Sequence, residues 1–501
     1  MSEIREWGDT PATWQDVVAV AQHGAQLQLS EAAWQRMQNA RQIVEEIVAS
    51  GQPAYGINTG LGALCNVILP PEALSQLSRN TLMSHACGVG PLLSVAQTRA
   101  IMCAAVANYS LGYSGISPDV VRALLAFINH GITPEVPSQG SVGYLTHMAH
   151  IGLALTGMGF VNWQGKRGLA CDALAEQGIT AVNPGAKDGL CLVNGTPCMT
   201  GLSCLALGEA KHLMDWADVT GAMSVEALKG QLAAFDERVL ALKSSPDVSA
   251  TGQRLRAMLH GSAWLAENQG VRTQDALSLR SIPQIHGACR AQWWHVETQV
   301  NQELNAATDN PLVLGEPGNW QVVSQANPHG ESVAMAADLL AIALAETGSV
   351  AERRLDRLIN PLVSELPPFL VAKPGVNSGM MIAQYVAASL CGENRRLAQP
   401  AVLDNYITSG LQEDHLSMGT SAALKLLQVC DNTWQILGIE YLLAAQALEL
   451  IGTSRLAPGT VQAVTLLRRE VAFWVEDRWL APEMKKTVQI MRNTPAENIA
   501  R

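Results

Sequence analysis

Residues 415–451, HLSMGTSAALKLLQVCDNTWQILGIEYLLAAQALELI, decide the fold class of this chain. Apolar residues recur there at spacings of three and four, and the stretch is longer than the ~8–20 residues of an ordinary helix. A second such stretch, ESVAMAADLLAIALAETGSVAERRLDRLI, covers residues 331–359. Long apolar helices are typical of a bundle, so the sequence predicts a mainly α-helical protein. Strand signals are sparse, and residues 17–29 are the best candidate for a small β-hairpin.

The first 200 residues differ from these long apolar stretches because they contain many turn-forming residues. Glycine stands beside Asn, Ser or Pro at several points, which predicts tight loops between shorter helices. We therefore expect a loop-rich N-terminal domain over residues 1–200 and a helical bundle over 201–501. Helices this apolar present more surface than one bundle hides, so we expect a homo-oligomer.

Composition excludes several classes of protein. The net charge of −11 comes from only 15% charged residues, and no dense run of Lys or Arg would attract a nucleic acid. The ten cysteines show no metal-ligand spacing, so no metal site is predicted and idle thiols in a reducing compartment are favoured. The N-terminus has no signal-peptide pattern, and no stretch of ~18 uninterrupted apolar residues occurs. We expect a cytoplasmic protein without a membrane partner.

Ten ordered blocks between about residues 50 and 450 carry a family resemblance. They are YGINTGLG (55–62), SHACGVG (84–90), GYSGI (112–116), GSVG (140–143), LVNGT (192–196), QDALSLRSIPQIHGA (274–288), TDNPLV (308–313), PPFLV (367–371), GVNSGMMIAQ (375–384) and QEDHLSM (412–418). In this order they resemble the histidine and aromatic amino acid ammonia-lyases. The resemblance implies the ammonia-lyase fold, related to that of the fumarases, and a homotetramer whose subunits share active sites.

One feature of that family is missing after GSVG. The family carries Ala-Ser-Gly there, which cyclises to an electrophilic methylidene-imidazolone, whereas here Tyr144 follows Gly143 directly. Either the gene lacks the tripeptide, or the cyclised group is present but is not written as amino acids. Tyr144 replaces a family Asp, Leu277 a family Tyr and Pro328 a family aromatic residue, which favours genuine absence. We therefore predict no cofactor; the imidazolone is expected between Gly143 and Tyr144 only in the second case.

The missing electrophile changes the substrate that the resemblance implies. The imidazolone helps ammonia to leave by bonding to the substrate amine. A trimethylammonium nitrogen has no lone pair for that bond, and it leaves as neutral trimethylamine. Ergothionases, relatives that lack the tripeptide, release trimethylamine from ergothioneine in this way. The sequence thus favours a carbon–nitrogen lyase acting on a small histidine-like betaine.

The resemblance also assigns the catalytic residues. Tyr55 matches the family's catalytic tyrosine and is predicted to remove the β-proton, which requires surroundings that favour its phenolate. Glu413 matches the acidic position near the substrate amine and is predicted to hold the trimethylammonium group, with tyrosine faces adding cation–π contact. The neighbours Asp414 and His415 are interpreted as structural.

Five further residues are predicted to bind substrate. Arg280 matches the carboxylate clamp and Asn194 would add a neutral donor, although an Asn before Gly also forms turns. His85 and Gln274 are placed beside the substrate ring. Tyr144 has no family precedent: it either encloses the methyl groups or fills the space of the imidazolone.

Two other functions stay open. One is an ordinary histidine or aromatic amino acid ammonia-lyase that contains the imidazolone. The other is an inactive homologue that regulates or assembles with a partner lyase. Retention of Tyr55, Arg280, Asn194 and Glu413 together argues against the inactive homologue.

Overall fold

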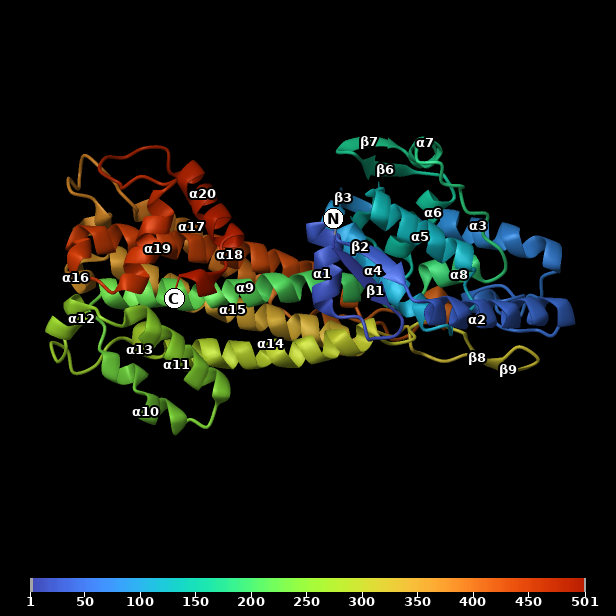
Figure 1. Ribbon diagram of the computed structural model, residues 1–501, viewed down its shortest axis with the longest axis horizontal. Coiled ribbons are helices and arrows are strands. Elements are labelled where there is room, and N and C mark those ends of the chain that lie inside the picture. The colour runs from blue at the N-terminus through green and yellow to red at the C-terminus, as the bar shows by residue number, and fades with distance from the viewer. Residues whose placement is uncertain (1–2, 500–501) are drawn as a thin grey trace. The chain divides into compact units, whose positions relative to one another are not determined.

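The computed structural model describes residues 3–499 and is mainly α-helical, as the sequence predicts (Figure 1). Its chain divides into two compact units. The first comprises the described part of Met1–Gly208 with Val296–Asp338 and Pro400–Leu424, and the second comprises Glu209–His295, Leu339–Gln399 and the described part of Lys425–Arg501. Both units thus combine segments that lie far apart in the sequence.

The first unit packs short helices around α4, which is buried on all sides from Thr98 to Ser110. A smaller apolar cluster joins α2 to Ile57 and Val313. The helices of this unit are α1 (Trp14–His23), α2 (Glu31–Ser50), α3 (Leu74–His85), α4 (Val95–Ser110), α5 (Pro118–His130), α6 (Thr146–Leu155), α7 (Ala170–Glu176) and α8 (Asp188–Val193).

Four small sheets complete the first unit. They pair β1 (Ile4–Trp7) with β2 (Gln26–Leu29), β3 (Val89–Leu92) with β5 (Pro137–Gln139), β4 (Thr133–Pro134) with β6 (Phe160–Trp163) and β7 (Lys166–Leu169), and β8 (Leu312–Glu316) with β9 (Asn319–Val323). The pairing of β3 with β5 holds the segment that follows His85 against the turn that follows Gln139.

The predicted hairpin over residues 17–29 is wrong. Thr13 and Asp16 form a capping box that starts α1, and Gly24 ends the helix with a left-handed φ of 75°. Only β2 is a strand, and it pairs in parallel with β1. The helix caps outweigh the β-branched composition of this segment because they satisfy the free amides and carbonyls of the helix ends.

Four long helices of the described chain contribute residues to both units. They are α9 (Pro197–Ala227), α14 (Ile282–Leu304), α15 (Glu331–Ile359) and α18 (Gly419–Ile451). The periodicity predicts two of them, α15 and α18. By length and composition, Asp188–Ala227 and Glu331–Ile359 also resemble membrane spans. However, 100% and 67% of their apolar windows are buried within the protein, as in core helices of a globular protein.

The second unit adds short helices to these long ones. They are α10 (Glu237–Ala241), α11 (Pro246–Leu259), α12 (Ala263–Glu267), α13 (Leu277–Arg280), α16 (Pro361–Ser364), α17 (Met381–Leu397), α19 (Pro458–Arg468) and α20 (Leu480–Asn493). A buried ion pair fixes its centre: Arg354 Nε lies 2.5 Å from Glu440 Oε1, and neither side chain is exposed. Thr220 and Ser224 each donate a hydrogen bond of 2.8 Å to the same carboxylate, so the buried Glu440 is well compensated, whereas Arg354 Nη1 is buried without a hydrogen-bond partner among the described residues.

Candidate active site

The turn over residues 140–145 stands where the family carries its tripeptide. Leu145 has a φ of 80° and a ψ of −68°, and the Thr146 amide donates to the Tyr144 carbonyl over 3.3 Å. These values describe a γ-turn with positive φ, the rare and strained form. Strain of this kind persists only where surrounding contacts enforce it, and it concentrates at functional sites.

Contacts with the segment before α18 hold this turn in place. The Met418 amide donates to the Val142 carbonyl over 3.0 Å, and Thr420 Oγ1 donates to the Gly143 carbonyl over 3.3 Å. Gly143 has a φ of 145°, and a Cβ on it would lie 2.5 Å from Ser417 Oγ. A glycine is therefore required at this position, and the turn is fixed against the loop that carries Glu413.

Tyr55 lies in a tight loop after α2. Asn58 and Thr59 shape this loop by accepting hydrogen bonds from the amides of Ala54 (2.8 Å) and Gly56 (3.0 Å). The Gly62 amide donates to the Tyr55 hydroxyl over 3.3 Å. Burial raises the pKa of Tyr55 above its ordinary value; the Gly62 hydrogen bond opposes this rise, and the negative charge of Glu413 adds to it.

Glu413 is the centre of the candidate site. Its carboxylate accepts a hydrogen bond from Thr408 Oγ1 over 3.2 Å, and its charge contributes to the raised pKa of Tyr144. Two backbone hydrogen bonds between Thr408 and Glu413 close the loop around this contact. Burial, followed by the negative charge of Glu413, raises the pKa of Tyr144, so its phenol stays protonated.

His85 is the last residue of α3, and it lies close enough to Glu413 to be influenced by its charge. Its Nδ1 lies 2.9 Å from Ser84 Oγ. Burial lowers the pKa of His85, while the charge of Glu413 opposes the shift. Downstream, the Gly88 amide donates to His150 Nε2 over 3.1 Å, which fixes this segment to α6. The structure therefore brings His85, Tyr55, Tyr144 and Glu413 into one electrostatic environment.

Both polar atoms of the Asn194 side chain already form hydrogen bonds within the protein. Its Nδ2 donates to Asp309 Oδ1 over 3.1 Å and to the Asn310 carbonyl over 2.8 Å, and its Oδ1 accepts from the Gly195 amide over 3.0 Å. Both amide hydrogens are thus engaged in holding the 308–311 segment. Substrate binding by Asn194 stays a prediction, and it requires one of these hydrogen bonds to be exchanged.

Gln274 and Arg280 belong to the second unit. Gln274 is exposed, and Arg280 closes α13, where its Nε donates to the Asp275 carbonyl over 3.0 Å. The family's Tyr position near them, Leu277, is also exposed. The substrate-binding roles of Gln274 and Arg280 stay predictions.

Sequence reasoning missed the residues that support this site. Thr408 lies outside every recognised block, and only its pairing with Glu413 identifies it. Lys187 forms a buried ion pair with Asp309 at 2.7 Å, through which it supports Asn194. A lysine before a helix gives no sequence signal for burial, because lysine is among the residues least often buried.

The residues present do not fit the imidazolone. No Ala-Ser-Gly stands between Gly143 and Tyr144 to cyclise. The backbone on both sides of Tyr144 is already engaged, by Thr420 Oγ1 at the Gly143 carbonyl and by the Val193 carbonyl at the Leu145 amide, over 2.9 Å. Tyr144 itself follows Gly143 directly, where the family's tripeptide would stand.

Residues 12–469 match the family model described as aromatic amino acid lyase. The protein belongs to this family and is a carbon–nitrogen lyase of the histidine and aromatic ammonia-lyase group, as the resemblance implies. It is 44% identical to histidine ammonia-lyase from Symbiobacterium thermophilum, over 96% of this chain and 95% of the relative.

Solved structures agree with this assignment. The fold is similar to histidine ammonia-lyase from Trypanosoma cruzi, with a TM-score of 0.92, 35% identity and coverage of 99% of this chain and 95% of the other. It is equally similar to ergothionase from Treponema denticola, with a TM-score of 0.92, 29% identity and coverage of 99% and 100%. That protein is described as an ergothioneine-degrading enzyme. The predicted fold class is thus confirmed.

Proposed function

We propose that this lyase eliminates a trimethylamine group from a histidine-like betaine, most simply ergothioneine, without an imidazolone. The observation that carries the proposal is the turn at Gly143, which Met418 and Thr420 hold in place and which runs directly into Tyr144 without a tripeptide that could cyclise. A site without an electrophile needs a substrate whose amine is already a good leaving group.

The proposed step is a β-elimination. The Tyr55 phenolate takes the proton from Cβ, the electrons of the broken C–H bond form the Cα=Cβ double bond, and the C–N electron pair leaves with neutral trimethylamine. The products are a conjugated acrylate, trimethylamine and the protonated Tyr55, which returns its proton to water. The atoms and charges balance without an oxidant or a covalent intermediate.

Each predicted residue has a defined task in this proposal. Glu413 holds the trimethylammonium group beside the ring of Tyr144, which offers a cation–π face. Arg280 and Asn194 bind the carboxylate, and His85 and Gln274 bind the ring. The raised pKa of Tyr144, to which the charge of Glu413 contributes after burial, supports placing the first pair together. The tasks of the others rest on the family resemblance.

A direct test offers the enzyme ergothioneine and, separately, histidine. We expect trimethylamine and acrylate absorbance from ergothioneine, and no ammonia from histidine. Tyr55→Phe should abolish the reaction, whereas Tyr385→Phe, at a tyrosine with 63% exposure, should not. Ammonia from histidine without trimethylamine from ergothioneine would overturn the proposal.

A second candidate is an imidazolone-containing histidine ammonia-lyase. The identity of 44% to a protein of that name favours it. The intact mass of the purified chain separates the two: an imidazolone adds the mass of Ala-Ser-Gly less the water lost on cyclisation. A mass equal to that of the printed sequence removes this candidate.

We also propose that the enzyme is a cytoplasmic homotetramer. All ten cysteines lie within the described residues and are free thiols, which suits a reducing compartment. Leu362 and Val376 are each 90% exposed and Leu411 is 74% exposed, so each unit presents apolar side chains that further subunits would cover.

A further inference from the structure

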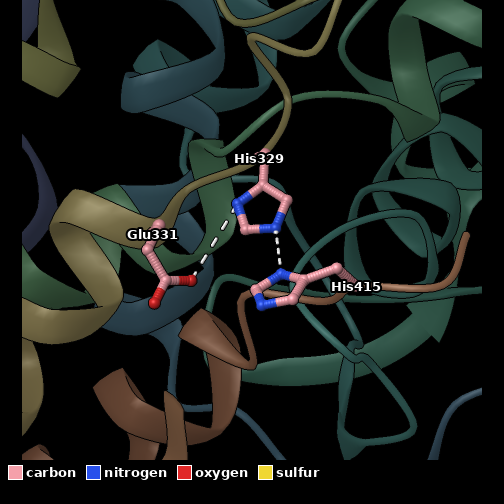
Figure 2. Close-up of side chains that lie close together, drawn as sticks. All are labelled: His329, Glu331 and His415. Atoms are coloured by element: carbon pink, nitrogen blue, oxygen red, sulfur yellow. Dashed lines mark hydrogen bonds and ion pairs between the residues drawn. The ribbon is translucent and has the colours of Figure 1, made fainter. Parts of the chain in front are cut away.

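Three side chains with metal-binding atoms, none of which has an assigned catalytic task, meet beside the loop that carries Glu413. His329 precedes α15, Glu331 is the first residue of α15, and His415 lies in the loop before α18 (Figure 2). One ligand atom from each lies within 4.8 Å of the others. His329 and His415 are separated by 86 residues in sequence, so no spacing pattern reveals them.

The two imidazoles are already close to the separation that a metal requires. His329 Nε2 lies 3.0 Å from His415 Nδ1, and the rings stack at 28°. Two nitrogens bound to one tetrahedral zinc ion at 2.0–2.1 Å lie about 3.3–3.4 Å apart. The separation of the two nitrogens therefore has to change by only a few tenths of an ångström, and the rings have to turn until both lone pairs point at the ion, which replaces their single hydrogen bond.

One oxygen of the Glu331 carboxylate is left without a hydrogen bond among the described residues, and a cation could bind it. Its Oε2 is buried and accepts no hydrogen bond from the described residues. The nearest positive group is the ring of His329, whose Nδ1 lies 4.0 Å away and is charged only when protonated. A buried oxygen without a partner costs stability, and a bound cation removes that cost.

Packing on one methionine brings the two loops together. Met199 of α9 lies under both Gly330 and Gly419: a Cβ on either glycine would come within 2.4 Å of its Sδ. Gly330 separates His329 from Glu331, and Gly419 begins α18 just after His415. A buried contact thus fixes the backbone close to all three side chains.

We propose that His329, Glu331 and His415 bind one divalent transition-metal ion, for which Zn²⁺ is the appropriate probe. Two imidazoles and one carboxylate form a ligand set of zinc sites that leave a fourth position for water. Because His415 is exposed, that position faces solvent. The ion would tie the loop of Glu413, two residues before His415, to the first turn of α15.

The test uses the full-length enzyme without substrate, so its outcome is independent of the proposed lyase reaction. The chain is freed of metal with a chelator, kept reduced, and titrated with ZnCl₂ against a chromophoric chelator. We expect one tight equivalent per chain and a melting temperature that rises with Zn²⁺. His415→Ala, His329→Ala and Glu331→Gln should each weaken binding by at least about 10–100-fold, the loss caused by removing even an outer-shell partner.

Two controls keep the result decisive. His23→Ala changes an exposed histidine in the first unit and should bind Zn²⁺ as the unaltered chain does. Co²⁺ in place of Zn²⁺ reports the ligands by its absorption, and thiolate-to-cobalt bands would assign binding to cysteines instead. The proposal is overturned by such bands, by an unaltered chain that binds no Zn²⁺, or by site variants that fold normally and bind as tightly as the unaltered chain.

Discussion

The buried ion pair between Lys187 and Asp309 gives the sharpest prediction about how the site is held. Lys187 Nζ donates to Asp309 Oδ2 over 2.7 Å and to the Ser114 carbonyl over 2.6 Å, and the two side chains are 0% and 1% exposed. Burial opposes the charge of Lys187, but Asp309 offsets it and the pKa of Lys187 is raised. Lys187→Met removes the positive partner and leaves the carboxylate buried.

The expected magnitude follows from that uncompensated charge. Breaking one partner of a buried ion pair costs about 3–5 kcal/mol of unfolding free energy. Lys187→Met/Asp309→Asn removes both charges, and the new amide oxygen still accepts from Asn194 Nδ2 and the Asn310 amide, as Asp309 Oδ1 does at 3.1 and 2.7 Å. The double variant should therefore lose only about 1–2 kcal/mol, roughly the value of one net hydrogen bond.

Urea unfolding followed by tryptophan fluorescence measures this difference. All variants are compared by their midpoints at one chain concentration, because subunit association makes stability depend on concentration. Arg396→Met, which breaks a surface pair with Glu393, is the matched control and should leave the midpoint unchanged. If the double variant is as unstable as Lys187→Met, or less stable, the reasoning from uncompensated charge is refuted.

Three further outcomes are expected. Gly143→Ala should destabilise the turn by about 1–3 kcal/mol and reduce turnover, because its φ is 145° and a Cβ would lie 2.5 Å from Ser417 Oγ; unchanged kcat would contradict this. Burial lowers the pKa of His150 below its ordinary 6.5, so the unfolded chain binds the proton more strongly and stability should fall as pH drops below about 6.5; His150→Gln should make the fall shallower, as chemical denaturation at each pH would show. Light scattering should give a particle of about four times the chain mass of 53.5 kDa, and a monomer would remove the proposed tetramer.

The long helices were predictable because their sequence period is that of the structure itself. The stretches over 331–359 and 415–451 correspond to α15 and α18, although α18 begins at Gly419. Periodicity failed over residues 17–29, where the Thr13 cap and Gly24 decide the structure. Local end signals of this kind involve two or three residues, and a window that averages apolar character passes over them.

The site was predictable only to the extent that it lies in recognisable blocks. Tyr55, His85 and Glu413 could be named from motifs, and the structure brings them together with Tyr144. Their supports could not be named, because Thr408 acts through a single pairing across five residues and Lys187 through an ion pair across 122 residues. Such contacts depend on tertiary packing, which one sequence without its fold does not specify.

The electrostatics of the site bear on why a permanent cation suits it. Burial raises the pKa of Tyr55 and of Tyr144, and Glu413 adds to both shifts, so the free site disfavours the phenolate that β-elimination needs. A trimethylammonium group held at Glu413 would offset that negative charge and lower the pKa of Tyr55 when the base is needed. An ordinary ammonium gives the same help only while it keeps its proton, and beside a phenolate it can lose that proton. A fully methylated nitrogen has none to lose, so the substrate that needs no electrophile is also the one that most securely activates the base.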